Sequence, residues 1–101
     1  MAAKSRSDII GDIEDHVHEH AKGKFGSWVV GLSSQPKTAL TDTHKVKAGK
    51  HPYIVRRAKS PEEAVEVVQY LSSVKGMKQA ADIDPAAVHI YAYLTSFRTK
   101  P

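Results

Sequence analysis

Residues 25–40 constrain the fold most, because their pattern predicts a strand that leads directly into a short helix. The strand is predicted over 25–33, where Trp28, Val30 and Leu32 alternate onto one face. The helix is predicted over 36–40, which opens with a proline whose fixed backbone suits a first helical turn. This succession of strand and helix indicates a mixed α/β fold.

Two longer helices are predicted elsewhere in the chain. The first covers residues 8–22, where apolar side chains recur at helical spacing after Ser7, a residue type that caps helices. The second covers residues 61–75 and has the stronger start. There Ser60 supplies a capping hydroxyl, and Pro61 is pre-set for the first helical position.

Two further strands are predicted over residues 53–58 and 87–95, and the polar residues 41–51 predict an exposed loop. In the last strand Tyr91 and Tyr93 face the side opposite the aliphatic residues. The connection between these strands is long enough for a parallel crossover. We therefore predict an α/β (α+β) fold with a small three-stranded mixed sheet packed with helices, in the order α-β-α-β-α-β.

The chain length fits one domain, residues 1–101, with flexible termini at 1–7 and 96–101. Hydrophobic residues make up 41% and charged residues 26%, which is typical of a globular protein rather than a disordered chain. The absence of cysteine excludes disulfides and cysteine-type zinc sites. We expect no signal peptide and no membrane helix, since no apolar stretch approaches the ~18 residues of a span, and hence a cytoplasmic or virion location.

The net charge of +4 is distributed unevenly along the chain. Residues 43–61 contain no acid and six lysines and arginines, whereas acids crowd the predicted first helix. Spaced basic side chains can contact several phosphates by charge alone, in binding that depends on salt but not on base sequence. Exposed lysines are also ordinary solubilising residues. The predicted surface for DNA or RNA consists of Lys45, Lys47, Lys50, Arg56 and Arg57.

Two blocks of this sequence resemble the GIY-YIG endonuclease superfamily over roughly residues 8 to 95. The first is Trp28-Val29-Val30-Gly31 with the later Thr38-Ala39-Leu40, which is similar to the Tyr-Ile-Gly strand and the Arg-Leu helix of those enzymes. The second contains Glu62-Glu63-Ala64, Tyr70-Leu71 and Tyr91-Ala92-Tyr93. It is similar to a helix and a strand of small, mostly uncharacterised bacterial and phage members.

In active GIY-YIG nucleases, tyrosines on the first strands, an arginine on the next helix and a metal-binding glutamate on a later helix carry the reaction. At the matching positions this chain has Val29, Ala39 and Val68, and the first tyrosine motif has no counterpart. None of these side chains can ligate a metal or donate a hydrogen bond to a phosphate. The resemblance therefore implies a degenerate member without the catalytic Tyr, Arg and Glu, and we predict no catalytic residue, no metal site and no cofactor.

Two other groups of side chains invite a functional interpretation. His16 and His20 share a helical face at i, i+4 spacing, and with His18 they resemble a metal-binding cluster. We favour surface histidines paired with neighbouring acids. Tyr91 and Tyr93 resemble a stacking platform for single-stranded nucleic acid. We favour the alternative that they cover the second face of the sheet against the N-terminal helix.

Three functional hypotheses follow. The leading one is a catalytically inactive GIY-YIG-like binding module that contacts the nucleic-acid backbone through the basic loop and strand. The alternative is a structural or adaptor subunit of a larger phage or host protein assembly, with a protein partner. The third is a residual metal-dependent nuclease with relocated ligands.

Overall fold

The computed structural model describes residues 2–21, 25–44, 46, 52–80 and 83–95. In chain order the elements are β1 (Ala3–Lys4), α1 (Arg6–Ala21), the 3-10 turn η1 (Phe25–Ser27), β2 (Trp28–Ser33), α2 (Pro36–Thr38), the π-helical turn η2 (Ala39–Thr43), β3 (Tyr53–Ala58), α3 (Pro61–Ser73), β4 (Lys78–Gln79) and β5 (His89–Leu94).

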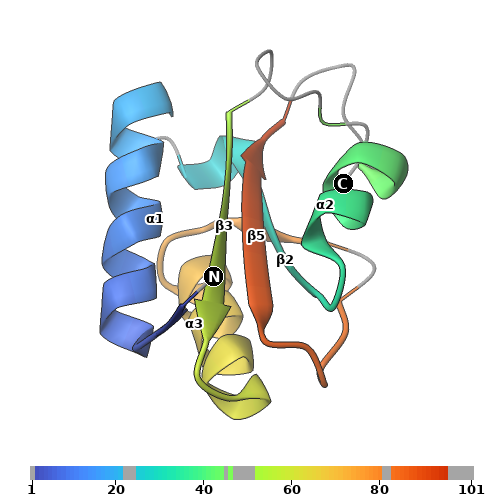
Figure 1. Ribbon diagram of the computed structural model, residues 1–101. Helices are drawn as coiled ribbons and strands as arrows, with labels where there is room; N and C mark the ends of the chain where they lie inside the picture. The colour runs from blue at the N-terminus through green and yellow to red at the C-terminus, as the bar shows by residue number, and fades with distance from the viewer. Residues whose placement is uncertain (1, 22–24, 45, 47–51, 81–82, 96–101) are drawn as a thin grey trace.

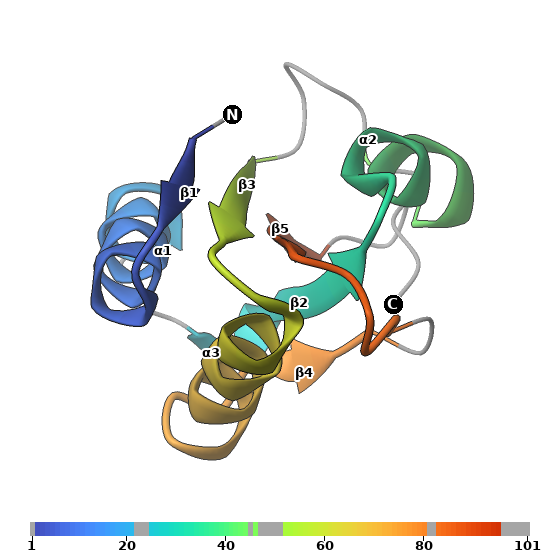
Figure 2. The ribbon, with the colours of Figure 1, turned by 60° about the horizontal axis from the view of Figure 1, so that its bottom comes forward.

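The strands form one five-stranded mixed sheet in the order β1-β3-β5-β2-β4. Figure 2 shows this order from one edge of the sheet to the other. The central strand β5 is antiparallel to both of its neighbours, β3 and β2. The edge strands β1 and β4 are parallel to their neighbours β3 and β2, so all strands except β5 run in one direction. The prediction of three strands found the long ones and missed β1 and β4. Each of these has two residues, too few to show a period of two.

The predicted parallel crossover between the strands at 53–58 and 87–95 is wrong, because β3 and β5 pair antiparallel. After α3 the chain first enters β4, which runs in the direction of β3, and only then reverses into β5. The reversal passes a turn at Asp84, whose carbonyl accepts a hydrogen bond from the Ala87 N–H at 3.1 Å and whose carboxylate accepts one from the Ala86 N–H at 3.0 Å. The helix thus connects parallel strands, but the second of them is β4.

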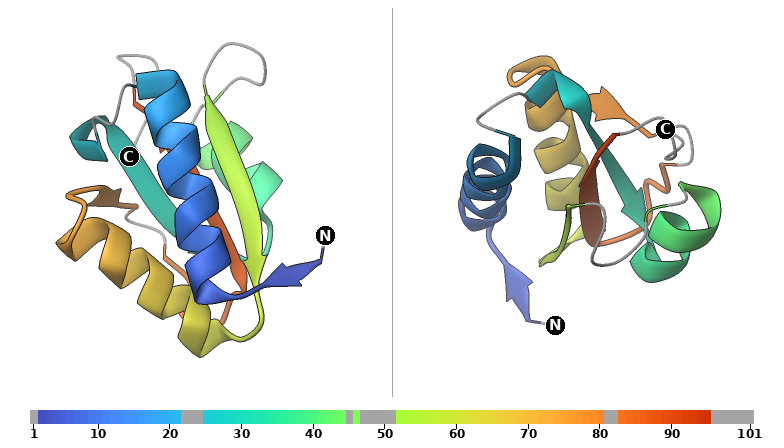
Figure 3. Two further views of the ribbon diagram at one scale, coloured as in Figure 1. Left: turned by 90° about the vertical axis from the view of Figure 1, so that its left-hand side faces the viewer. Right: turned by 90° about the horizontal axis from the view of Figure 1, so that it is seen from above.

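Two hydrophobic clusters lie on opposite faces of the sheet. Helices α1 and α3 cover one face and α2 with η2 covers the other, as Figures 1 and 3 show. The first face carries Trp28, Val30 and Leu32, which are all fully buried, so the predicted alternation of β2 is confirmed. The second face carries Val29 and the two tyrosines of β5.

The two long helices begin as their capping residues dictate. The Ser60 hydroxyl accepts a hydrogen bond from the Glu63 N–H at 3.2 Å, which confirms the predicted start of α3. Helix α1 begins earlier than predicted, because Ser5 rather than Ser7 accepts from the Asp8 N–H, at 3.3 Å. Within the end expected to be flexible, residues 1–7, β1 takes up residues 3–4 and α1 begins at residue 6. The other expected flexible end, 96–101, lies outside the described residues.

Candidate functional site

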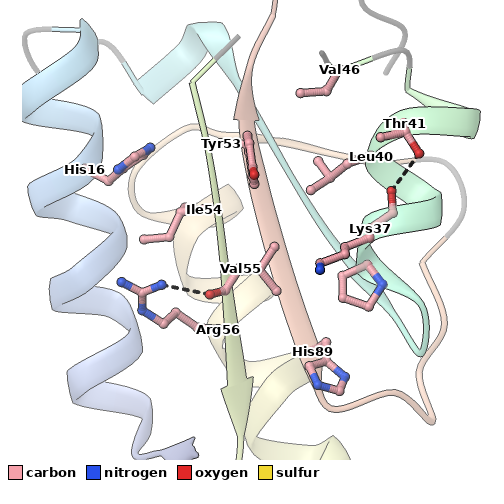
Figure 4. A pocket seen from close by; sticks show the side chains of 11 residues that line it. His16, Lys37, Leu40, Thr41, Val46, Tyr53, Ile54, Val55, Arg56 and His89 are labelled. Atoms are coloured by element: carbon pink, nitrogen blue, oxygen red, sulfur yellow. Dashed lines mark hydrogen bonds between the residues drawn. The ribbon is translucent and has the colours of Figure 1, made fainter. Parts of the chain in front are cut away.

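A groove of about 810 Å³ follows the outer edge of β3, and we call it the edge groove. Its floor is the strand segment from Tyr53 to Arg56. Helix α1 forms one wall with His16, and α2 with η2 forms the other with Lys37 and Leu40 (Figure 4). Val46 and His89 of β5 complete the lining, so segments that are distant in the sequence build one site.

The backbone of β3 turns polar groups towards this groove. The Leu94 N–H donates to the Pro52 carbonyl at 3.1 Å, so the hydrogen bonds between β3 and β5 involve Pro52 and every second residue after it. The N–H and C=O groups of Tyr53 and Val55 consequently point away from β5, towards the outer edge.

Strand β1 covers only the far end of this edge. It pairs with Arg57 and Ala58 and ends there. On the outer side of β3, opposite β5, no strand within the described ranges pairs at Tyr53 or Val55. This part of β3 is an open strand edge at the bottom of a groove.

Arg56 anchors the α1 wall to the floor. Its Nε donates to Asp12 Oδ2 at 2.8 Å, and its Nη1 donates to the Val55 carbonyl at 2.8 Å. Asp12 Oδ2 also accepts a hydrogen bond from Lys4 Nζ at 2.7 Å. The hydrogen bond from Lys4, followed by that from Arg56, lowers the pKa of Asp12 below its ordinary value. This network connects β1, α1 and β3, and it occupies the edge carbonyl of Val55.

His16 contributes a partly buried ring to the same wall. Burial lowers its pKa below the ordinary value, and the nearby His20 lowers it further, although Glu19 and the backbone of Tyr53 act in the opposite direction. Its Nε2 atom is buried and has no hydrogen-bond partner among the described residues. His16 is therefore a neutral ring at neutral pH, packed edge-on against Trp28 at 5.5 Å between ring centroids.

The charged residues in the described lining of the groove are Lys37 and Arg56, and both are cationic. Lys37, on the α2 wall, is exposed and extends towards β3 in Figure 4. Tyr53 adds an aromatic ring that is 39% exposed. Cations, outward amides and one accessible ring together suit an extended anionic ligand.

The predicted nucleic-acid-binding residues are only partly described. Lys45, Lys47 and Lys50 lie outside the described residues. Arg56 lies in the groove but is engaged with Asp12 and Val55, and Arg57 is exposed beside β1.

Lys37 and Tyr53 are site residues that the sequence does not predict. The strand pattern predicts correctly that Tyr53 lies in a strand, but such a pattern does not tell whether the strand lies at the edge of a sheet. Lys37 is a single lysine in a short helix, and no local signal marks it as a neighbour of β3.

The positions that match the catalytic residues of the resembled family are all buried. Val29 and Ala39 belong to the cluster under α2 and η2. Val68 belongs to the cluster on the opposite face, between the sheet and the long helices.

A second polar group, which the sequence does not predict, lies beneath η2. His44 is fully buried, with Nε2 at 2.7 Å from Tyr91 Oη and Nδ1 at 3.0 Å from Tyr93 Oη. The predicted exposed loop is thus wrong at His44 and also at Val46, which is buried. The preferred prediction that Tyr91 and Tyr93 are buried on the second face of the sheet is confirmed. The predicted packing against the N-terminal helix is wrong, because α1 packs on the aliphatic face of β5 and the tyrosines lie under η2. They form no exposed stacking platform.

The histidines of α1 do not gather into a metal site in the described chain. The rings of His16 and His20 lie 4.4 Å apart, whereas His18 packs edge-on against Phe25 at 5.9 Å. No group of three or more His, Asp or Glu side chains that could hold a metal ion occurs among the described residues.

Comparisons of the chain with protein-family models, with curated proteins and with solved structures found no match. The resemblance to GIY-YIG domains therefore stays a prediction. None of the helices in the described ranges has the length and apolarity that a membrane crossing requires.

Proposed function

We propose that this chain is a GIY-YIG-like binding module without catalytic activity, which holds the sugar-phosphate backbone of a nucleic acid, in the cytoplasm or in a virion. The observation that carries the proposal is the edge groove, which is lined by the exposed Lys37 and by the strand segment whose Tyr53 and Val55 amides point outward. Its described charged lining residues, Lys37 and Arg56, are both cationic. In the sequence, Lys47 and Lys50 lie between two lining residues, Val46 and Tyr53.

The chemistry of phosphate contacts supports this assignment. A phosphate oxygen accepts hydrogen bonds and carries negative charge, so ammonium groups and backbone N–H groups are suitable partners. The exposed Arg57 and Lys59 extend the basic surface beyond the end of the groove. Such a surface binds with a strong dependence on salt and a weak dependence on base sequence.

A mobility-shift titration at several salt concentrations tests the proposal with a matched pair of variants. Lys37→Glu should weaken binding by roughly threefold to tenfold and flatten the salt dependence by about one phosphate contact. Lys78→Glu makes the same charge change in the exposed strand β4, at the opposite edge of the sheet, and should have less effect. Wild-type binding no tighter than that of a neutral control protein would refute the proposal.

The absence of catalysis is tested separately. Plasmid DNA incubated with a high concentration of the protein and magnesium or manganese should stay supercoiled. Nicking that co-purifies with the protein and disappears with chelator would support the residual nuclease instead.

A second candidate function is that of an adaptor subunit in a protein assembly, and one surface feature favours it. Tyr70 in the last turn of α3 is 37% exposed, and Val74, the C-cap residue four positions later, is 63% exposed. Adjacent exposed apolar side chains are common at protein interfaces. Purification from the native host with light scattering would reveal a stoichiometric partner, and Val74→Lys should release it.

A further inference from the structure

We infer that the edge groove takes a single-stranded nucleic acid, with a phosphate against the outward amides of Tyr53 and Val55 and a base stacked on the ring of Tyr53. This inference rests on the proposed function and narrows its ligand to one form of nucleic acid.

The hydrogen-bonding groups at the open edge of β3 favour an acceptor-rich ligand. A regular added β-strand would need both N–H and C=O groups along this edge. The carbonyl of Val55 already accepts a hydrogen bond from Arg56 Nη1 at 2.8 Å, whereas its N–H points into the groove. Phosphate oxygens need donors only. With the Val55 carbonyl occupied, the two outward N–H groups of Tyr53 and Val55 outnumber the one remaining carbonyl, that of Tyr53, so the edge suits a phosphodiester better than a regular peptide strand.

Tyr53 adds an accessible aromatic ring on which a base can stack, and a purely electrostatic surface lacks such a ring. Tyr53 is 39% exposed, whereas the two tyrosines of β5 are fully buried. Bases stack on accessible aromatic rings without regard to their identity, because every base presents a flat face. Lys37 lines the same groove, and its side chain extends towards β3 near Val55 in Figure 4, so a strand that stacks a base on Tyr53 can meet this cation at a neighbouring phosphate.

The shape of the site selects against a duplex. The amides of Tyr53 and Val55 lie on the strand between α1 on one side and α2 with η2 on the other, as Figure 4 shows for these elements. The volume of about 810 Å³ lies within the range of ordinary small-ligand pockets, which span about 300–1,000 Å³. We therefore expect an unpaired strand to contact the amides of Tyr53 and Val55 between the two helices more readily than a duplex does.

Fluorescence anisotropy with a labelled oligothymidine and a hairpin duplex of equal length tests the inference. The single strand should bind the wild-type chain at least about tenfold more tightly than the duplex. Tyr53→Ala should remove roughly tenfold of single-strand affinity and little duplex affinity, while Tyr53→Phe should keep both. The matched control is Tyr70→Ala on α3, because Tyr70 is 37% exposed but does not line the groove.

Other outcomes separate the two proposals. Equal affinity for both forms, weakened alike by Lys37→Glu, would overturn this inference and leave the proposed function standing. Binding of neither form would overturn both. Equal binding of a poly-glutamate peptide would overturn this inference, because it would mean recognition of charge alone. Ultraviolet cross-linking of the wild-type complex needs no variant. It should attach the oligonucleotide at Tyr53, and attachment only at Tyr70 would refute the inference.

Discussion

Tyrosine serves different purposes in two regions of this molecule. Beneath η2, the hydroxyls of Tyr91 and Tyr93 lie within hydrogen-bond distance of the two ring nitrogens of His44, and all three side chains are fully buried. In the edge groove the Tyr53 ring is 39% exposed, and its backbone amide points to an open strand edge. Polar groups paired inside the protein stabilise the fold. Those that face an open groove can serve a ligand, so a substitution should affect stability in the first region and binding in the second.

The largest expected effect is on stability, from His44→Ala. The substitution removes one hydrogen bond from each tyrosine hydroxyl and leaves a cavity, so the free energy of unfolding should fall by about 2–4 kcal/mol. Urea denaturation measures the loss, and oligonucleotide affinity of the folded fraction should be unchanged. His18→Ala, at an exposed position, should stay within about 0.5 kcal/mol of wild type. An equally small change for His44→Ala would remove the contrast between the two regions.

The next largest effect on stability is expected from Gly31→Ala. A Cβ atom at this position would overlap the ring of Tyr91, so the alanine forces the buried cluster to shift and should cost about 1–3 kcal/mol. Gly11→Ala is the matched control, because a Cβ atom at Gly11 meets nothing within 4 Å. In the middle of α1 it should instead stabilise the protein, by about 0.5–1 kcal/mol. Thermal unfolding of the two variants should therefore shift in opposite directions, and equal shifts would contradict the packing described for Gly31.

Acidification should weaken the wall of the groove in two steps. Because the pKa of His16 is lowered in the folded state, the unfolded state binds its proton more readily, and stability falls as the pH drops below the ordinary histidine value of about 6.5. The pKa of Asp12 is also lowered, so its contribution is lost below the ordinary value of about 3.9. Denaturation at a series of pH values measures both steps. His16→Gln should abolish the first loss of stability, below about pH 6.5. If stability still falls with pH in this range as in the wild type, another group causes that step.

The smallest effect is expected from Asp12→Asn. The Asp12 side chain is half-buried and its partners Lys4 and Arg56 are partly exposed, so loss of these ion pairs should cost about 1 kcal/mol. The freed Arg56 guanidinium should raise oligonucleotide affinity, by up to about threefold. Denaturation and anisotropy on the same preparation measure both. A fall in affinity would show that the groove needs the α1 wall in place more than it needs another cation.

Local patterns in the sequence predicted the long elements well. The Ser60-Pro61 helix start, the alternation of Trp28, Val30 and Leu32, and the bounds of β3 are all found in the structure. These features depend on capping and side-chain periodicity, which act between residues near in the chain.

The sheet and the groove depend on contacts that no local pattern encodes. The reversal after β4 decides the direction of β5, and it follows a strand of two residues. His44 is a polar residue in a basic stretch, and the two tyrosine hydroxyls that face its ring nitrogens come from a strand almost fifty residues away in the chain. The edge groove joins α1, α2 and β3, so its cations could not be recognised as neighbours before the fold was known.

The most direct test of the central claim is a map of backbone amide chemical shifts during titration with a short oligothymidine. The account predicts that the amides of Tyr53, Val55 and Lys37 shift together and saturably, while those of Tyr91 and Lys78 stay in place. Shifts centred on Tyr70 and Val74 of α3, with the edge groove unaffected, would contradict it.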